Sequence, residues 1–170
     1  MANETEPPRF ACDAMMRGLA RWLRSCGYDA TWTYGIDDDE LLRQAVEQDR
    51  VVLTADGGIV RRPEVARGEP AVHYVPNELP PRAQAVAVLR HFALPLRTPR
   101  CMACGGERRQ VPKESVADEA PPRSYLAFDR FFRCQRCGRL LWAGTHWERI
   151  DAQLRELARD LSEPPTPADD

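Results

Sequence analysis

Residues 9–34 read RFACDAMMRGLARWLRSCGYDATWTY, and this stretch decides the fold of the chain. A short apolar segment ends at Asp13, and residues 14–26 then carry apolar side chains at the spacing of one helix face. Gly27 follows at the position where glycine commonly ends a helix, and residues 30–34 form a second extended segment. The stretch therefore predicts a strand, a helix and a strand, which is the repeating unit of a parallel α/β sheet.

The alternation of strand and helix continues as far as residue 92. We expect a helix that begins at Asp37-Asp38-Asp39, strands over 50–53 and 72–75, and a helix over 78–92. Strands that alternate with helices favour a parallel sheet whose two faces are covered. The sequence therefore predicts an α/β domain over residues 9–97, joined to a second module by a short linker.

The second module is marked by two CxxC pairs, CMAC at 101–104 and CQRC at 134–137, with 29 residues between them. Four thiolates on two such turns suit the tetrahedral coordination of zinc. Two disulfides are the alternative, but they would need an oxidising compartment, and the first residues do not resemble a signal peptide. We therefore expect a zinc ribbon over 100–150 with a structural Zn²⁺ held by Cys101, Cys104, Cys134 and Cys137.

The rest of the chain carries weaker signals. Residues 112–123 are polar and contain proline, which predicts a loop, and residues 151–162 predict a short helix with a leucine stripe. We expect residues 1–8 and 163–170 to be disordered tails. No apolar run is long enough to span a membrane, so we expect a cytoplasmic protein with no membrane contact.

The net charge of −2 hides a basic segment, because residues 100–150 carry ten basic and six acidic side chains. Arginine suits phosphate recognition, since its planar guanidinium offers several donors. A solvated surface is the alternative for each single arginine. Lys113 is the only lysine, and it lies outside the α/β pattern, which argues against phosphoryl-transfer enzymes that need a lysine. The RNA-binding candidates are Arg17, Arg21, Arg24, Arg133, Arg136 and Arg139.

Three aspartates follow strands of the predicted sheet. Asp13 and Asp56 each end a strand, and Asp39 opens the helix after the second strand. Because the carboxyl ends of parallel strands meet at one edge, we expect these acids to converge. Clustered carboxylates repel unless a cation lies among them, and hard oxygen ligands favour Mg²⁺ or Mn²⁺. Asp39 capping its helix and Asp56 shaping a turn are the alternatives. Thr54 either orients an acidic ligand or is an ordinary threonine at the end of its strand.

The order of these motifs resembles the Mut-seven C-terminal family, which joins a PIN-type nuclease domain to a zinc ribbon. The resemblance covers about residues 9–150 and implies a PIN-like α/β/α sandwich with metal-dependent ribonuclease activity. It also implies that Asp13, Asp39 and Asp56 are the catalytic, metal-binding acids. One position departs from the family pattern, because the family usually has Thr-Arg-Asp where this chain has Thr54-Ala55-Asp56. The motifs that carry the resemblance are FACD at 10–13, LARWLR at 19–24, GYD at 27–29, DELL at 39–42, LTAD at 53–56, the two CxxC pairs and WAGTHW at 142–147.

We therefore expect a Mg²⁺- or Mn²⁺-dependent ribonuclease that hydrolyses RNA phosphodiester bonds, with the ribbon aiding stability or RNA binding. The alternative is a catalytically inactive PIN-like module that binds RNA or protein. If the chain is a ribonuclease, an antitoxin-like protein inhibitor is a further possible partner. The triple Asp37–Asp39 leaves open which of its members is a ligand. His146 is either a base or stacking partner for RNA or packs against the ribbon.

Overall fold

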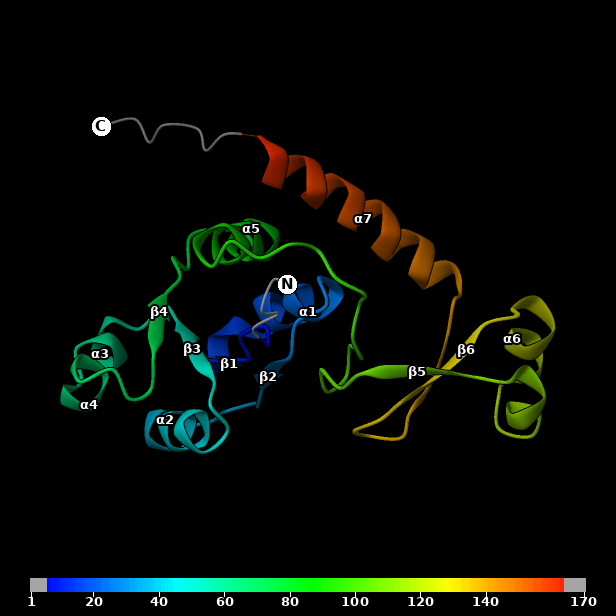
Figure 1. The fold of residues 1–170 in the computed structure, drawn as a ribbon, viewed down its shortest axis with the longest axis horizontal. Helices are drawn as coiled ribbons and strands as arrows, with labels where there is room; N and C mark the ends of the chain where they lie inside the picture. Colours follow the sequence, from blue (N-terminus) through cyan, green and yellow to red (C-terminus); the bar gives the residue numbers. More distant parts are fainter. Residues whose placement is uncertain (1–5, 164–170) are drawn as a thin grey trace, which may run out of the picture.

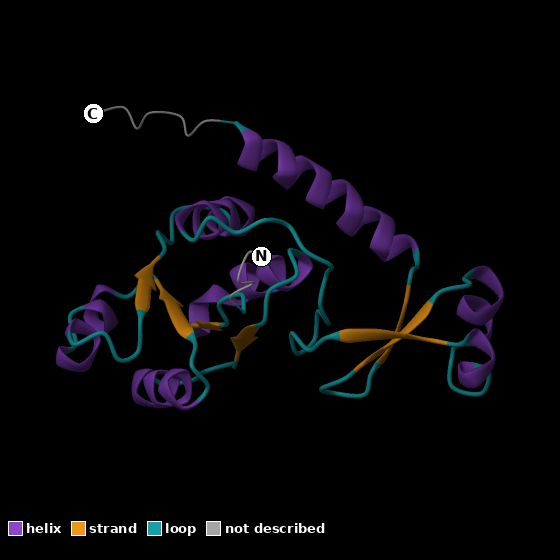
Figure 2. Ribbon diagram, viewed as in Figure 1, coloured by secondary structure: helices purple, strands orange, loops and turns teal. Residues whose placement is uncertain are grey.

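The central sheet contains four parallel strands in the computed structural model, which describes residues 6–163 (Figures 1 and 2). Its strand order is β2-β1-β3-β4, and each neighbouring pair is parallel. The parallel α/β sheet predicted from the sequence is therefore confirmed. The strands are β1 (Phe10–Cys12), β2 (Ala30–Trp32), β3 (Val51–Thr54) and β4 (Val72–Tyr74).

Helices cover both faces of this sheet. Helices α1 and α5 pack together on one face, whereas α2 contacts β1 and β3 on the other and the short α3 contacts β4 (Figure 1). The result is a three-layer α/β/α arrangement. The helical elements are η1 (Ala14–Met16), α1 (Arg17–Ser25), α2 (Asp38–Glu47), α3 (Gly57–Val60), α4 (Pro63–Ala66) and α5 (Pro81–His91).

The side chains of each strand alternate between two apolar cores. Phe10 and Leu53 belong to the core beneath α1 and α5, and Ala11 and Val52 to the core that faces α2. Strands buried on both faces read as nearly continuous apolar runs, as β1 and β3 do. This burial fixes the register of the strands, and with it the edge of the sheet at which their carboxyl ends lie.

The CxxC module contains a three-stranded antiparallel sheet in the order β5-β6-β7. Residues 112–123, expected to be a loop, contain a short 3₁₀ helix and the start of α6 instead. Val116 is 1% exposed and packs on Phe131, so one apolar side chain in a polar stretch anchors this segment to the ribbon. The elements are β5 (Arg108–Val111), η2 (Lys113–Val116), α6 (Pro122–Ala127), β6 (Phe131–Cys134) and β7 (Leu140–Trp142).

The last helix, α7 (Thr145–Ser162), is longer than the sequence predicted. It begins beside the ribbon and runs back to α5, where Leu157 is fully buried in the core of the α/β domain (Figure 1). Arg82 of α5 pairs with Glu156 at 2.7 Å. Of the expected tails, residues 1–5 and 164–170 lie outside the described residues. No helix within residues 6–163 has the length and apolar character needed to cross a membrane.

We predict that Gly18→Ala destabilises the protein, although alanine is the better helix former by about 1 kcal/mol. A Cβ at Gly18 would lie 2.6 Å from Cγ of Pro81, where α1 crosses α5. Overpacking of this kind costs about 1–3 kcal/mol, and the proline ring cannot move aside by rotation. Thermal unfolding measures the effect. Pro81→Ala should restore the stability of the Gly18→Ala variant, and equal loss in both backgrounds would contradict this explanation.

Candidate functional site

The four CxxC cysteines form one compact cluster. Their sulfur atoms all lie within 4.8 Å of one another, with Cys101 Sγ 3.9 Å from Cys137 Sγ and Cys104 Sγ 3.4 Å from Cys134 Sγ. A zinc–thiolate tetrahedron with bonds of about 2.3 Å has edges of about 3.8 Å, so the cluster fits Zn²⁺. All six cysteines are free thiols, which does not support the disulfide alternative. The expected ribbon with clustered cysteines is confirmed.

Backbone amides favour the thiolate form of Cys134, whereas burial raises the pKa of Cys104. The amides of Arg136 and Cys137 donate to Cys134 Sγ at 3.4 and 3.5 Å. Burial by itself would raise the pKa of Cys134, but these amides and the neighbouring thiols lower it to about 7. Burial raises the pKa of Cys12 and of Cys26 to about 12, so neither is a ready nucleophile.

Asp13 and Asp56 are joined through Thr54 at the carboxyl edge of the sheet. Thr54 is fully buried, and its Oγ1 donates to Asp13 Oδ2 at 2.6 Å. The same oxygen accepts the backbone N–H of Asp56 at 2.9 Å. Because β1 and β3 are adjacent parallel strands, the two aspartates leave the sheet side by side. The orienting role expected for Thr54 is consistent with this geometry.

The two carboxylates differ in their surroundings. Asp13 is 6% exposed, and its Oδ1 accepts the amide of Ala14 at 2.5 Å. Asp56 is exposed, and its Oδ1 accepts the amide of Gly58 at 2.6 Å, which caps α3. Asp56 therefore also shapes the turn, as the alternative interpretation stated. Both carboxylates are held by the backbone in a defined direction.

Asp39 does not join this pair. Its side chain is 85% exposed and pairs with Arg62, which also contacts Asp38 at 3.4 Å. The cap of α2 is Asp37, whose Oδ1 accepts the amide of Glu40 at 2.9 Å. Within the part of the chain that the structure describes, only the four cysteines bring three or more potential ligand atoms within 4.8 Å. The expected convergence of three acids is therefore not seen in this structure.

Sequence reasoning missed a buried ion-pair network that links the ribbon to the sheet domain. Asp29 is 8% exposed and accepts Arg50 Nη2 at 3.1 Å and both terminal nitrogens of Arg136 at 3.0 and 2.6 Å. Burial opposes its ionisation, but the hydrogen bonds from Arg136 and Arg50 hold the pKa of Asp29 below its usual value. The GYD motif at 27–29 was the only signal in the sequence.

Two of the RNA-binding candidates take part in contacts between the ribbon and the sheet domain. Arg136 lies within the second CxxC turn and binds Asp29, so its guanidinium is already paired. Arg24 is 5% exposed, and its Nη1 donates to the carbonyl oxygens of Met102 and Ala103 at 2.8 and 3.2 Å. The helical pattern put Arg24 on the polar face of α1, and the ribbon covers that part of the face. Both arginines hold the CxxC turns against the sheet domain.

The other arginine candidates have different surroundings. Arg133 forms a two-point pair with Glu119 at 3.1 and 2.6 Å, which partly neutralises it. Arg17 lies over the ring of Trp32 at 5.4 Å. Arg21 and Arg139 are exposed, and the side chain of His146 lies outside the described residues.

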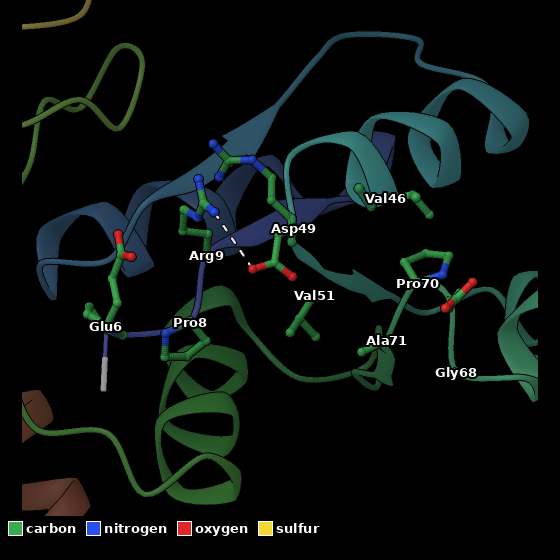
Figure 3. Close-up of a pocket in the computed structure, with 13 residues that line it drawn as sticks. Glu6, Pro8, Arg9, Val46, Asp49, Val51, Gly68, Pro70 and Ala71 are labelled. Atoms are coloured by element: carbon green, nitrogen blue, oxygen red, sulfur yellow. Dashed lines mark ion pairs between the residues drawn. The ribbon is translucent and has the colours of Figure 1, made fainter. Parts of the chain in front are cut away.

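A cavity of about 510 Å³ lies at the opposite, amino edge of the sheet. Figure 3 shows Arg9 and Asp49 facing one another at its rim, where they pair at 3.8 Å. Val51 begins β3 there, whereas Asp56 follows the far end of the same strand. This cavity is therefore separate from the Asp13–Thr54–Asp56 edge.

We predict that Asp29→Asn costs about 3 kcal/mol, because it leaves a buried guanidinium with reduced compensation. Chemical denaturation measures the loss. Asp49→Asn is the matched control, since Asp49 is 99% exposed and its weak pair with Arg9 contributes little. Equal stability of the two variants would show that the Asp29 network does not support the fold.

We predict one zinc ion per chain, detectable by elemental analysis. In the native protein we expect no thiol to react rapidly with a thiol reagent. After treatment with a strong chelator, the four CxxC thiols should react, whereas Cys12 and Cys26 should react only after unfolding. Chelation should also lower the stability of the sheet domain, because Arg24 and Arg136 connect it to the CxxC turns. Six equally reactive thiols in the native protein would refute the site.

The comparisons with known proteins agree with this architecture. A family model described as the Mut7-C RNAse domain matches residues 8–154. The matched span contains the four-stranded sheet, the Asp13–Thr54–Asp56 edge, the ribbon and the first part of α7. Searches of curated proteins and of solved structures gave no match. The resemblance seen in the motifs is thereby confirmed, and the chain belongs to the Mut7-C RNAse domain family.

Proposed function

We propose that the chain is a ribonuclease of the PIN type that uses Mg²⁺ or Mn²⁺ at the carboxyl edge of its sheet. The family match supports ribonuclease activity. The observation that carries the proposal is the Asp13–Thr54–Asp56 unit, in which the buried Thr54 hydroxyl bonds the carboxylate of Asp13 and the backbone N–H of Asp56. Ligand sites of open α/β sheets lie at this edge.

The chemistry of the donor set fits a hard divalent cation. Asp13 and Asp56 present carboxylate oxygens, and no thiol or imidazole is part of the unit. When bound, such a cation supplies positive charge at the scissile phosphate and lowers the pKa of a water. Thr54 and the amide of Ala14 orient Asp13, and the amide of Gly58 orients Asp56. These hydrogen bonds fix the direction of each carboxylate.

We keep Asp39 as the third acid of the proposed site. It opens α2, which follows the strand on the other side of β1. Arg62 offsets its charge in this structure, together with that of Asp38. Under the proposal, the cation competes with Arg62 for this carboxylate. Asp39→Asn should accordingly affect activity less than Asp13→Asn.

The rival proposal is an inactive PIN-like module that binds RNA or protein. The pairing of Asp39 with Arg62 favours it, because only two of the three expected acids are held together. An antitoxin-like inhibitor and a cytoplasmic location stay predictions from the sequence.

We predict that Asp13→Asn and Asp56→Asn abolish cleavage of single-stranded RNA, because each removes a charge that would bind the cation. Thr54→Val should lower the affinity for the activating Mn²⁺ about 10–100-fold, as is typical when a ligand loses its orienting partner. Asp49→Asn at the opposite edge should cleave like the unmodified protein. Cleavage of a labelled oligonucleotide, titrated with Mn²⁺, measures all four.

Chelators are a poor control in this assay, because they also remove zinc. Omission of added Mg²⁺ and Mn²⁺ with zinc retained is the better one. Cleavage that persists in Asp13→Asn and Asp56→Asn would contradict the proposed site. Purified protein that binds RNA but never cleaves it at any Mn²⁺ concentration would establish the rival.

A further inference from the structure

Two neighbouring cavities lie between the ribbon, α1 and α7. One, of about 410 Å³, lies against the ribbon, and the other, of about 270 Å³, lies against α1. Met102 of the first CxxC pair and Ile150 of α7 line both, so the two cavities adjoin. We call the combined feature the ribbon–α1 groove. It exists because Arg24 holds the first CxxC turn close to α1.

The charged side chains that line this groove are all arginines. Arg100 and Arg108 lie in the ribbon part and Arg21 in the α1 part, and no aspartate or glutamate lines either cavity. Glu107 approaches Arg100 at 3.5 Å but is not a lining residue. The protein as a whole has a net charge of −2, whereas the charged residues that line this groove are all positive. The groove is complementary to a chain of phosphates.

Aromatic side chains accompany these arginines. Trp142 and Phe128 line the ribbon part, and Trp22 lines the α1 part. All three are partly exposed, and therefore retain ring surface that is open to a ligand. Aromatic rings next to arginines are the usual means of holding single-stranded nucleic acid, since bases stack on the rings while phosphates bind the cations. A duplex could not place its bases against such rings without unpairing.

The groove leads toward the proposed site. Its residues on α1 are Gly18, Arg21, Trp22 and Ser25, which share one helix face by their spacing. From Ser25 to Gly18 this face rises about 10 Å toward the start of α1. Arg17 stacks over Trp32 at that end, and Asp13 caps the 3₁₀ turn just before it. A strand bound along α1 would thus run from the ribbon to the edge that carries Asp13.

We infer that the ribbon–α1 groove binds the single-stranded RNA that the proposed nuclease cleaves, an inference that rests on the proposed function. It assigns RNA binding first to the exposed Arg21 rather than to Arg133 and Arg136, which are engaged with Glu119 and Asp29. Arg100 lines the groove but also contacts Glu107 and donates to the carbonyl oxygen of Gly105. The substrate class is unpaired RNA, read through stacking and phosphate charge with little preference for sequence.

Binding is tested with oligouridylate in buffer without added Mg²⁺ or Mn²⁺, so that no cleavage interferes. Arg21→Ala, which alters an exposed helix residue, should weaken binding about tenfold, as expected for one lost charged hydrogen bond. The plot of log affinity against log salt should become shallower by about 0.7, the value for one phosphate of a single strand. Arg43→Ala is the matched control, because Arg43 is an exposed helix arginine on the opposite face of the sheet.

A second measurement does not depend on substitution. Oligouridylate that carries 5-iodouridine should crosslink under light to Trp142, Phe128 or Trp22, as mapped by mass spectrometry of the digested protein. Crosslinks only at other aromatic residues, or equal affinity and salt dependence of the Arg21→Ala and Arg43→Ala variants, would overturn the groove.

The experiments can contradict the groove proposal and the nuclease proposal independently. If RNA binds in the groove but is not cleaved at any Mn²⁺ concentration, the groove proposal stands and the nuclease proposal is wrong. If cleavage at limiting RNA requires Asp13 but is unchanged by substitution of Arg21 and Arg100, the nuclease proposal stands and the groove proposal is wrong. Loss of binding in Arg21→Ala supports the groove only if its thermal unfolding and zinc content match those of the Arg43→Ala control.

Discussion

The carboxylate of Asp29 is the point on which the arrangement of the two modules depends. A buried charge is tolerated only when it is paired, and Asp29 is paired twice, by Arg50 of the sheet domain and by Arg136 of the second CxxC turn. The ribbon also approaches very closely here. A Cβ at Gly105 would lie 3.1 Å from Asp29 Oδ1, and the φ of +76° at Gly105 is one that other residues rarely adopt.

This contact connects the cysteine cluster to the proposed chemistry. The four cysteines lie together on the two CxxC turns, and these turns contact Arg24 of α1 and Asp29, which directly precedes β2. The position of Met102, and with it the ribbon–α1 groove, follows from that geometry. Under the two proposals, a zinc ion in this cluster would take no part in catalysis. It would set the surface along which RNA reaches Asp13 and Asp56.

Arginine has several roles in this chain, and local sequence does not distinguish them. Arg21 and Arg24 are three positions apart on α1, yet one is exposed and the other is 5% exposed and bound to the ribbon backbone. Arg62 meets the acidic start of α2 from a distant turn. The guanidinium suits carbonyl oxygens, carboxylates and phosphates alike, so the partner that lies within reach decides the role.

The sequence by itself determined the elements that depend on local pattern. Helical spacing over residues 14–26, apolar strands such as Phe10–Cys12 and the CxxC spacing each require only near neighbours, and the fold, the cysteine cluster and the family followed from them. Tertiary structure decided which charged groups form pairs. Asp29 and Arg136, for example, are far apart in the sequence, and no periodic pattern predicts that they meet. The same reason explains why Asp13 and Asp56 are joined by Thr54 while Asp39 is held by Arg62.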